Sequence, residues 1–410
     1  MKTSRLRIIV TGLIGQHPAL GGVAWDYLQY AVGLARLGHE VYYFEDSGEW
    51  PYSLDGGPAG NDWVLRDPSA NIAHLKAVLS PYGLGDHWAY HFPLKSQWFG
   101  LSHRKRREVI ETADLLINVS GTLKRPHDYR LIPRLAYIDS DPVFTQIKLS
   151  LQRGCKKFQK RFHAHDVYFT FGDRIPGTDS HCRWLTTRQP ILLSEWNPSA
   201  TRREVYTTVM SWTSYKPLMF NRRRYGQKDV EFRRFLELPG KVSPIQLEVA
   251  VGGGHHLNWQ THDPSLPPAI SDLLEAKPTM TPVELLQRTG WRVVNPLETC
   301  GGLDSYRQYI ESSKGEWSVA KSGYVAGHSG WFSCRSACYM AAGRPVIVQD
   351  TGFQLPRGEG IVAFSTLEEA TDAMREVEGN YTRHAKAARD LASEYFDAPK
   401  VLRSLIDAIG

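Results

Sequence analysis

The chain has 410 residues, of which 42% are hydrophobic and 22% are charged, and its formal net charge at pH 7 is +6. A chain of this length usually exceeds one hydrophobic core, so two domains of about 200 residues each are expected. No apolar run approaches the ~18 residues of a membrane span, and the amino terminus lacks the long apolar region of a signal peptide, so the sequence predicts a cytoplasmic protein.

The first half of the chain alternates predicted strands with predicted helices. A strand at residues 6–10, a helix at about 23–37 and a strand at 41–44 form one βαβ unit. Further strands are predicted at residues 115–118, 135–138 and 167–171. This alternation predicts a parallel, doubly wound sheet, whereas residues 46–93 carry no pattern that assigns them to an element.

The second half repeats the alternation after a stretch that is dense in proline and glycine. Its predicted strands lie at residues 205–210, 245–251, 291–294 and 346–348. The expected division is a first domain at residues 1–200, a second at 201–385 and a helical segment at 386–410.

Residues 327–333 form a glycine-containing loop that leads into a predicted short helix. Gly330 lets backbone approach an anion, and the first N–H groups of the helix are unpaired and carry the positive end of its dipole. His328, Ser329 and Ser333 add side-chain donors, and Ser333 can also cap the helix. The loop therefore predicts a diphosphate cradle. The alternative is an ordinary helix-to-strand joint of an α/β domain.

The surroundings of this loop carry an excess of positive charge. From Trp317 through Gln349 there is no Asp or Glu, while Lys321, Arg335 and Arg344 are present. Such a field favours a phosphate-rich ligand.

The same segment resembles the donor-binding region of GT-B-fold glycosyltransferases. Residues 328–333 are similar to the His-Cys-Gly-Trp-Asn-Ser signature of family-1 enzymes, and residues 340–347 are similar to the Met-Ala-Cys-Gly-x-Pro-Val-Val run of family-4 enzymes. Near the amino terminus, Gly21, Gly22 and residues 34–41 are similar to the opening of family-4 enzymes.

The resemblance implies an α/β fold with two Rossmann-like, doubly wound domains that face each other across a cleft. The first domain would bind the acceptor and the second the nucleotide-sugar donor, and the terminal helical segment could cross back to the first domain. The chain departs from these families at their glutamates. Gly330 and Cys338 stand where the family-4 pattern has two, and Ser336 lies near the place of the family-1 glutamate.

The function implied is a metal-independent glycosyltransferase without a cofactor, similar to hexosyltransferases. Lys228 and Lys321 match basic side chains that would bind the diphosphate, and Asp350 could accept hydrogen bonds from sugar hydroxyls; for Lys228 a plain surface lysine is the alternative. The full set of candidate donor-binding residues is Gly21, Gly22, Lys228, Lys321, His328, Ser329, Gly330, Ser333, Arg335 and Asp350.

Two residues that follow predicted strands of the first domain are candidates for catalysis. His17 lies in the loop after the first strand, where α/β folds place catalytic groups, and could be the general base; an exposed or backbone-bonded loop histidine is the alternative. Asp139 could orient His17 or bind acceptor hydroxyls. It could equally form a turn before Pro142 through its own side-chain hydrogen bonds.

Other functions stay open at this stage. A dinucleotide-dependent oxidoreductase would use Asp46 on the ribose, although the first loop lacks Gly-x-Gly-x-x-Gly. A GT-B-fold epimerase or hydrolase, or a non-catalytic sugar-nucleotide binder, would use the same donor cradle. Residues 252–254 are interpreted as a close backbone approach to a ligand.

The partners expected are a nucleotide-sugar donor and a glycan, lipid-linked or small-molecule acceptor, without nucleic acid. Two basic runs, residues 103–107 and 221–224, could meet anionic lipid headgroups, with a solvated surface as the alternative. No metal site is predicted, because the five cysteines contain no Cys-x-x-Cys pair and neither residues 163–166 nor residues 252–263 show a standard ligand spacing.

Overall fold

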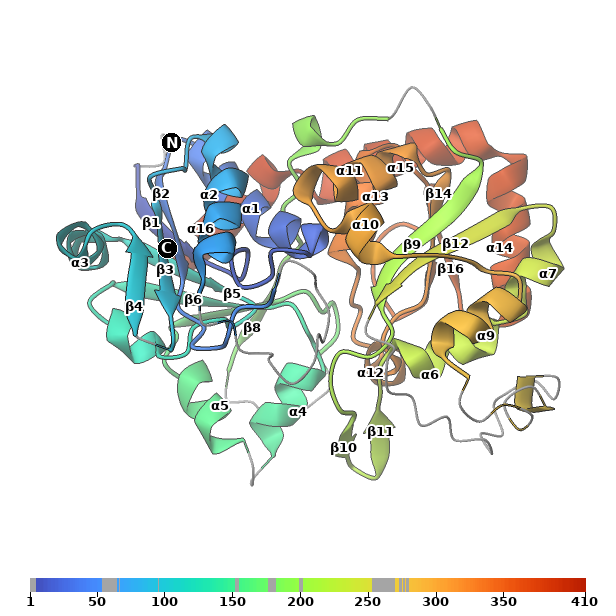
Figure 1. Ribbon diagram of the computed structural model, residues 1–410, viewed down its shortest axis with the longest axis horizontal. Helices are drawn as coiled ribbons and strands as arrows, with labels where there is room; N and C mark the ends of the chain where they lie inside the picture. The colour runs from blue at the N-terminus through green and yellow to red at the C-terminus, as the bar shows by residue number, and fades with distance from the viewer. Residues whose placement is uncertain are drawn as a thin grey trace. The chain divides into compact units, whose positions relative to one another are not determined.

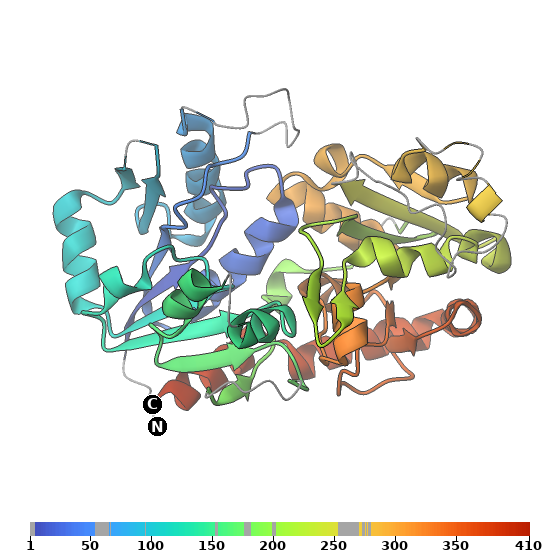
Figure 2. The same cartoon turned by 90° about the horizontal axis from the view of Figure 1, so that it is seen from below.

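The computed structural model describes residues 5–53, 65, 67–94, 96–151, 155–175, 182–198, 202–252, 270–272, 275, 277 and 280–410. The chain forms two compact units, each built around a sheet (Figures 1 and 2). The first unit contains Met1–Leu193, Cys300–Arg307 and Tyr395–Gly410, and the second contains Ser194–Thr299 and Gln308–Glu394. None of the described helices is long and apolar enough to cross a membrane.

Within the described residues, the first unit contains an eight-stranded sheet in the order β4-β3-β2-β1-β5-β6-β7-β8. All neighbouring strands of this sheet are parallel except β3 and β4. The strands are β1 (Arg7–Thr11), β2 (Glu40–Glu45), β3 (Trp88–Phe92), β4 (Gln97–Gly100), β5 (Leu115–Val119), β6 (Arg134–Asp139), β7 (Val167–Thr170) and β8 (Trp184–Thr186). The central strands are buried almost throughout, as expected where helices cover both faces of a parallel sheet.

Helices pack around this sheet, and the last helix of the chain belongs to the first unit. The helices are α1 (Gly21–Arg36), α2 (Ser69–Leu79), α3 (His103–Thr112), α4 (Phe144–Ser150), α5 (Lys156–Phe162) and α16 (Ala398–Ile409). Helix α16 packs against α1. A Cβ atom at Gly33 would lie 2.5 Å from Leu402 Cδ1, so the glycine permits this close contact.

The second unit contains, among the described residues, a six-stranded sheet in the order β13-β12-β9-β14-β15-β16, with every neighbouring pair parallel. Its strands are β9 (Val205–Ser211), β12 (Gln246–Gly252), β13 (Arg292–Val294), β14 (Gly315–Ser318), β15 (Val346–Gln349) and β16 (Ile361–Phe364), and a separate hairpin consists of β10 (Leu218–Phe220) and β11 (Arg223–Tyr225). The helices in this half of the chain are α6 (Lys228–Phe232), α7 (Leu238–Val242), α9 (Pro282–Arg288), α10 (Pro296–Cys300), α11 (Leu303–Ser312), α12 (Ser322–Gly327), α13 (Cys334–Ala341), α14 (Leu367–Gly379) and α15 (Tyr381–Tyr395).

A cluster of aromatic side chains packs against one face of the second sheet. Trp317 on β14 stacks on Phe364 of β16 with ring centroids 5.3 Å apart, and Phe232 of α6 meets Trp317 edge-on at 5.6 Å. Each such ring removes a large apolar area from water, so these contacts order β14 and β16 beside α6.

The structure confirms the five strands predicted in the first half of the chain; they are β1, β2, β5, β6 and β7, expected at residues 6–10, 41–44, 115–118, 135–138 and 167–171. It also confirms the four strands predicted in the second half, which are β9, β12, β13 and β15. Three elements within or next to residues 46–93, which the sequence left unassigned, are α2, β3 and β4. Strand β3 escaped prediction because all five of its residues are buried, including His91, so no alternation marks it.

Both sheets place their first strand centrally, and the strand order reverses beside it. The reversal lies between β1 and β5 in the first unit and between β9 and β14 in the second. In doubly wound sheets, ligands bind at the carboxyl ends of the strands at such a switch point. These two edges are therefore where functional side chains are expected.

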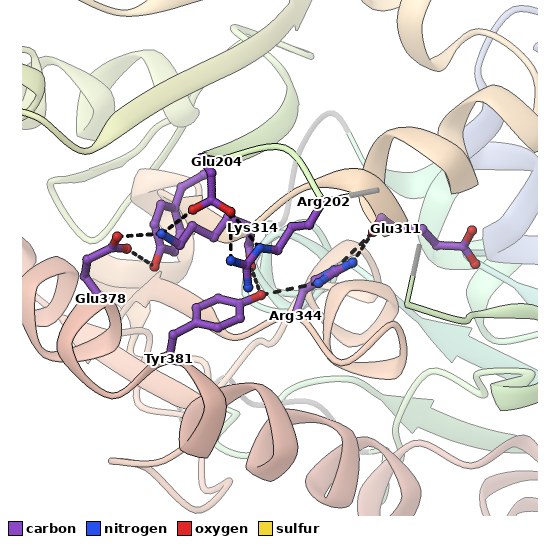
Figure 3. Close-up of polar contacts among 8 residues, drawn as sticks. Arg202, Glu204, Glu311, Lys314, Arg344, Glu378 and Tyr381 are labelled. Carbon is purple, nitrogen blue, oxygen red and sulfur yellow. Dashed lines mark hydrogen bonds and ion pairs between the residues drawn. The ribbon is translucent and has the colours of Figure 1, made fainter. Parts of the chain in front are cut away.

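The opposite, amino edge of the second sheet is closed by a polar network (Figure 3). The Lys314 ammonium, just before β14, lies 2.7 Å from Glu204 Oε2 and 2.5 Å from Glu378 Oε1. Tyr206 donates to the other oxygen of Glu378 at 2.9 Å, and the Tyr381 hydroxyl donates to the Lys314 carbonyl at 2.6 Å. Arg202 lies 2.7 Å from the other carboxylate oxygen of Glu204, so two cations face two carboxylates at this edge.

Replacing Lys314 by methionine should show how much this network stabilises the second unit. The Lys314 side chain is only 11% exposed, and loss of its ammonium leaves Glu378 without a cation, so we expect the free energy of unfolding to fall by about 1–3 kcal/mol. Glu204 is 61% exposed, and Glu204→Gln should cost less than about 1 kcal/mol. Urea unfolding of both variants measures the difference; equal losses would contradict this account of the network.

Candidate functional site

Three basic side chains gather near the carboxyl ends of β9 and β14, at the switch point of the second sheet. Lys228 begins α6, Lys321 is the residue before α12, and Arg335 lies in the first turn of α13. The pKa of the half-buried Lys228 ammonium is held well below its usual value, first by burial and then by the charges of Arg335 and Lys321. The three cations are thus close enough to repel one another.

A buried acid fixes one of these cations. Glu316 on β14 is fully buried, and its Oε1 accepts a 2.6 Å hydrogen bond from Arg335 Nε. Arg335 also donates to the Val209 carbonyl on β9 at 2.8 Å. The other carboxylate oxygen of Glu316 has no hydrogen-bond partner among the described residues. Glu316 stands one residue before the acid-free tract in the sequence, so the pattern of charges there gave no sign of it.

Lys321 is held by aromatic residues. Its ammonium donates to the Tyr215 hydroxyl at 3.0 Å and lies 4.6 Å from the centre of that ring and 5.2 Å from the Tyr324 ring. Ring faces attract cations, so these contacts orient the ammonium while leaving its charge intact. With Lys228 and Arg335, it gives this edge an excess of positive charge over Glu316.

The loop after α12 contains two residues with left-handed backbone. His328 ends α12 with a φ of 44° and is exposed, and Gly330 has a φ of 70°. The Gly330 N–H donates to the Thr351 carbonyl at 2.8 Å, and the buried Ser329 hydroxyl accepts from the Trp331 N–H at 3.4 Å. His328 is therefore the most exposed residue of this loop, while Trp331 is half-buried and Ser329 and Gly330 are buried.

The start of α13 presents serine hydroxyls. Ser333 occupies the N-cap position, but its side chain makes no capping hydrogen bond. Ser336, one turn into the helix, is 1% exposed, and its hydroxyl lacks a partner among the described residues. Both line a hollow of about 10 Å³ with the ends of β14 and β15, which is roughly the volume that one water occupies.

Asp350 lies at the end of β15 and is already engaged. Its carboxylate accepts two hydrogen bonds from Arg357, at 2.7 and 2.9 Å, and one from the Gly352 N–H at 2.7 Å. Burial raises the pKa of Asp350, but these bonds outweigh it and lower the pKa below its usual value. Its assignment to sugar hydroxyls stays a prediction, since a hydroxyl would have to share this carboxylate with Arg357.

In the first unit, His17 lies in the loop between β1 and α1. Its ring stacks on Tyr52 with centroids 4.5 Å apart, and burial lowers its pKa to about 4. A histidine with this pKa is neutral at pH 7, which is the state that a general base requires.

Glu45, at the end of β2, binds the backbone of the loop that carries His17. Its Oε1 accepts from the Gly15 N–H at 2.7 Å and from the Tyr43 hydroxyl at 2.9 Å, and its Oε2 accepts from the Gln16 N–H at 3.0 Å. Glu45 is 2% exposed, and burial raises its pKa to about 7. The sequence showed Glu45 only as the last residue of a strand, because a partner on another loop cannot be read from spacing.

The remaining candidate residues of the first unit, Asp139, Gly21 and Gly22, all make close contacts within that unit. Asp139 is 1% exposed, and its carboxylate accepts from Thr145 at 2.6 Å, from Thr170 at 2.9 Å and from further donors on the following turn. A Cβ atom at Gly21 would lie 2.1 Å from the Gly302 carbonyl oxygen, so this glycine, like Gly22 beside Tyr306, allows contact with another part of the first unit. Roles in catalysis or donor binding for these residues stay predictions. Residues 253–256 of the predicted glycine turn lie outside the described residues.

Solved structures share this arrangement of two parallel sheets. No family model matches the sequence, and no curated protein sequence matches it. An alpha-glucosyltransferase in complex with UDP-glucose and DNA containing an abasic site matches over 99% of this chain and 100% of its own, with a TM-score of 0.55 and 10% identity. Anabaena Alr3699/HepE in complex with UDP-glucose matches over 98% and 99%, with a TM-score of 0.57 and 10% identity. The predicted GT-B fold is confirmed.

Changing Glu45 to glutamine should alter how stability depends on pH. The unfolded chain releases the Glu45 proton near the ordinary pKa, whereas the folded chain keeps it until about pH 7, so the wild type loses stability as pH rises through this window. The loss is on the order of 3 kcal/mol, and the variant should not show it. Urea unfolding at several pH values between 4 and 8 compares the two proteins, and parallel curves would show that Glu45 titrates normally.

Proposed function

We propose that this protein is a glycosyltransferase that moves a sugar from a nucleotide-diphosphate donor to an acceptor hydroxyl. The observation that carries the proposal is the group of cations, Lys228, Lys321 and Arg335, at the carboxyl edge of the second sheet. Three basic groups beside one acid cannot all carry charge without cost, which is why the pKa of Lys228 is depressed by burial and by its two neighbours, and a diphosphate would supply the missing negative charge. The proposal assigns the donor to the second unit and the acceptor to the first.

The same cations would accelerate the reaction. When the bond between the sugar and the diphosphate breaks, negative charge accumulates on the leaving phosphate oxygens. Positive groups already in place stabilise that charge without having to reorganise. Lys321 and Arg335 are held by Tyr215 and Glu316, so they are oriented before the donor arrives. Because side chains supply this charge, the proposed reaction needs no metal ion.

His17 is the proposed base for the acceptor hydroxyl. It is neutral at pH 7, and the loop that carries it is bound through Gly15 and Gln16 to Glu45. A weak base with a pKa of about 4 accepts a proton only as the transition state forms, when the hydroxyl becomes acidic. The acceptor proposed is a glycan, a lipid-linked sugar or a small molecule, and the absence of nucleic acid among the partners stays a prediction.

Uridine is the first donor base to test, because the alpha-glucosyltransferase and Alr3699/HepE were both solved with UDP-glucose. Ser336 stands near the place where the family-1 pattern has its ribose-binding glutamate, and its buried hydroxyl lacks a partner among the described residues. We propose that Ser336 and the exposed His328 contribute to this end of the donor site.

The oxidoreductase alternative is disfavoured by Asp46. A ribose-binding acid has to present its carboxylate to the ligand, but Asp46 is 4% exposed. Its two oxygens are bound to His91 Nδ1 at 2.8 Å and to the Tyr129 hydroxyl at 3.1 Å. A non-catalytic sugar-nucleotide binder would share the donor site, and is distinguished by binding the donor without transferring or hydrolysing it.

The donor site is tested by measuring UDP binding with calorimetry. Replacing Lys228 by methionine should weaken binding by roughly 10-fold to 100-fold, because one charge on the diphosphate loses its partner. The matched control is Lys386→Met, which removes an exposed lysine of α15 that is paired with Asp390, and it should leave binding unchanged. If both variants bind UDP as the wild type does, the cations do not form the donor site.

The same calorimetric titration also measures how many protons the protein takes up when UDP binds. A bound diphosphate favours the charged form of Lys228, whose pKa is depressed in the free protein, so binding should take up a proton and weaken as pH rises. Repeating the calorimetry in buffers with different ionisation enthalpies measures this uptake, which Lys228→Met should abolish.

Replacing His17 by glutamine should reduce kcat by about 10²- to 10⁴-fold while leaving UDP binding intact. Since His17 is protonated only near pH 4, the acid limb of the wild-type rate profile should lie below the ordinary range of histidine. The rate of UDP release from UDP-glucose, with candidate acceptors present, is the measurement. An unchanged kcat would remove His17 from the reaction and leave the donor site standing.

A further inference from the structure

The β10–β11 hairpin has no part in the proposed reaction. In the described part of the chain its two strands pair only with each other, and the turn residues Asn221 and Arg222 have φ values of 48° and 60°. Figure 1 shows the hairpin extending away from the six-stranded sheet, and β11 contacts α12 at its base. A two-stranded hairpin is marginally stable alone, so this contact anchors it.

The hairpin is strongly basic. Lys216, Arg222, Arg223 and Arg224 are exposed, and no Asp or Glu occurs from residue 205 to residue 228. Within the described residues, none of these four side chains forms an ion pair. The acid that does sense the charge of Arg224 is Asp229 at the start of α6, whose pKa burial nevertheless raises. The four charges are therefore available to an external partner.

An exposed apolar side chain lies among these charges. Met219 is 60% exposed, and the strand register places it directly opposite Arg224. Leu218 and Phe220, on either side of it, are half-buried. A single exposed apolar side chain is common on a protein surface, but one that lies among four exposed cations matches the charged and apolar layers of a bilayer interface.

We propose that the β10–β11 hairpin docks on an anionic lipid surface. Lipid phosphates would meet the guanidinium groups, and the Met219 side chain would reach the boundary below the headgroups. Nucleic acid fits less well, since its phosphate backbone offers arginine a partner but gives Met219 no apolar layer. Four cations and one apolar side chain predict reversible binding that salt weakens.

The second basic run, residues 103–107, differs from the hairpin in how its charges are paired. In α3, Lys105 lies 2.7 Å from Glu108 and Arg107 lies 2.7 Å from Glu111. The Arg106 guanidinium lies 4.2 Å from the centre of the Trp98 ring. Two of these cations are thus paired with acids of their own helix and a third lies over a ring of β4, so the two runs, which look alike in sequence, differ in the charge that they present.

The test is co-sedimentation of the full chain with vesicles of phosphatidylcholine, with and without phosphatidylglycerol. The triple variant Arg222→Ser/Arg223→Ser/Arg224→Ser should lose roughly 100-fold in affinity for the anionic vesicles. The matched control, Arg104→Ser/Lys105→Ser/Arg107→Ser, removes the same number of charges and should change affinity by less than about 3-fold. Met219→Asn, which keeps every charge, should weaken binding by several-fold.

Each outcome decides the proposal. Equal losses in both triple variants would show that net charge alone drives binding, and binding to neutral vesicles would exclude recognition of charge; either overturns it. A DNA duplex that binds the hairpin more tightly than anionic vesicles do would replace lipid by nucleic acid. The inference does not rest on the proposed transfer reaction, and a circular-dichroism spectrum and a urea unfolding midpoint equal to those of the wild type show that the hairpin variant is folded.

Discussion

The carboxyl edge of the second sheet, where the donor site is proposed, depends on the buried ion pair between Glu316 and Arg335. It joins β14 to the first turn of α13, and the bond from Arg335 to the Val209 carbonyl extends the connection to β9. The pair thus ties together the two strands between which the sheet reverses and the start of α13. A buried pair of this kind contributes little net stability, but removing either partner leaves an uncompensated charge in the interior. Its role is to fix geometry at the switch point.

Around this pair, the charge on the two edges of one sheet differs in a way that bears on function. At the amino edge, Lys314 stands between Glu204 and Glu378 and Arg202 pairs with Glu204, so two cations face two carboxylates. At the carboxyl edge, Lys228 and Lys321 stand beside a pair that is already neutral, and the pKa of Lys228 is depressed first by burial and then by the charges of Arg335 and Lys321. A buried basic group with a depressed pKa beside other cations is unfavourable for folding and is a candidate for binding an anion.

Hydrophobic runs predicted most of both sheets, because central parallel strands are buried on both faces and read as continuous apolar segments. Strand β14 was not predicted, because it is buried without reading as a continuous apolar segment. In Gly315–Ser318 the side chain of Trp317 enters the aromatic core, while Glu316 enters the interior beside Arg335, so the strand reads as polar although all four residues are buried. Glu45 is a second buried acid of this kind. Sequence shows that a residue can carry charge, but burial and partners decide whether it does.

The two basic runs show that surface charges have the same limit, because sequence alone does not give their partners. Both read as clusters of arginine and lysine, and neither composition nor spacing separates them. The difference arises because α3 brings Glu108 and Glu111 onto the turn beside its own cations at helical spacing, while the hairpin spans a stretch that contains no acid at all. Helical periodicity matches charges three and four residues apart, whereas a tight turn at Asn221 and Arg222 directs neighbouring charges into solvent. Whether a basic run is a neutralised face or a binding surface is therefore decided by its secondary structure as much as by its charge.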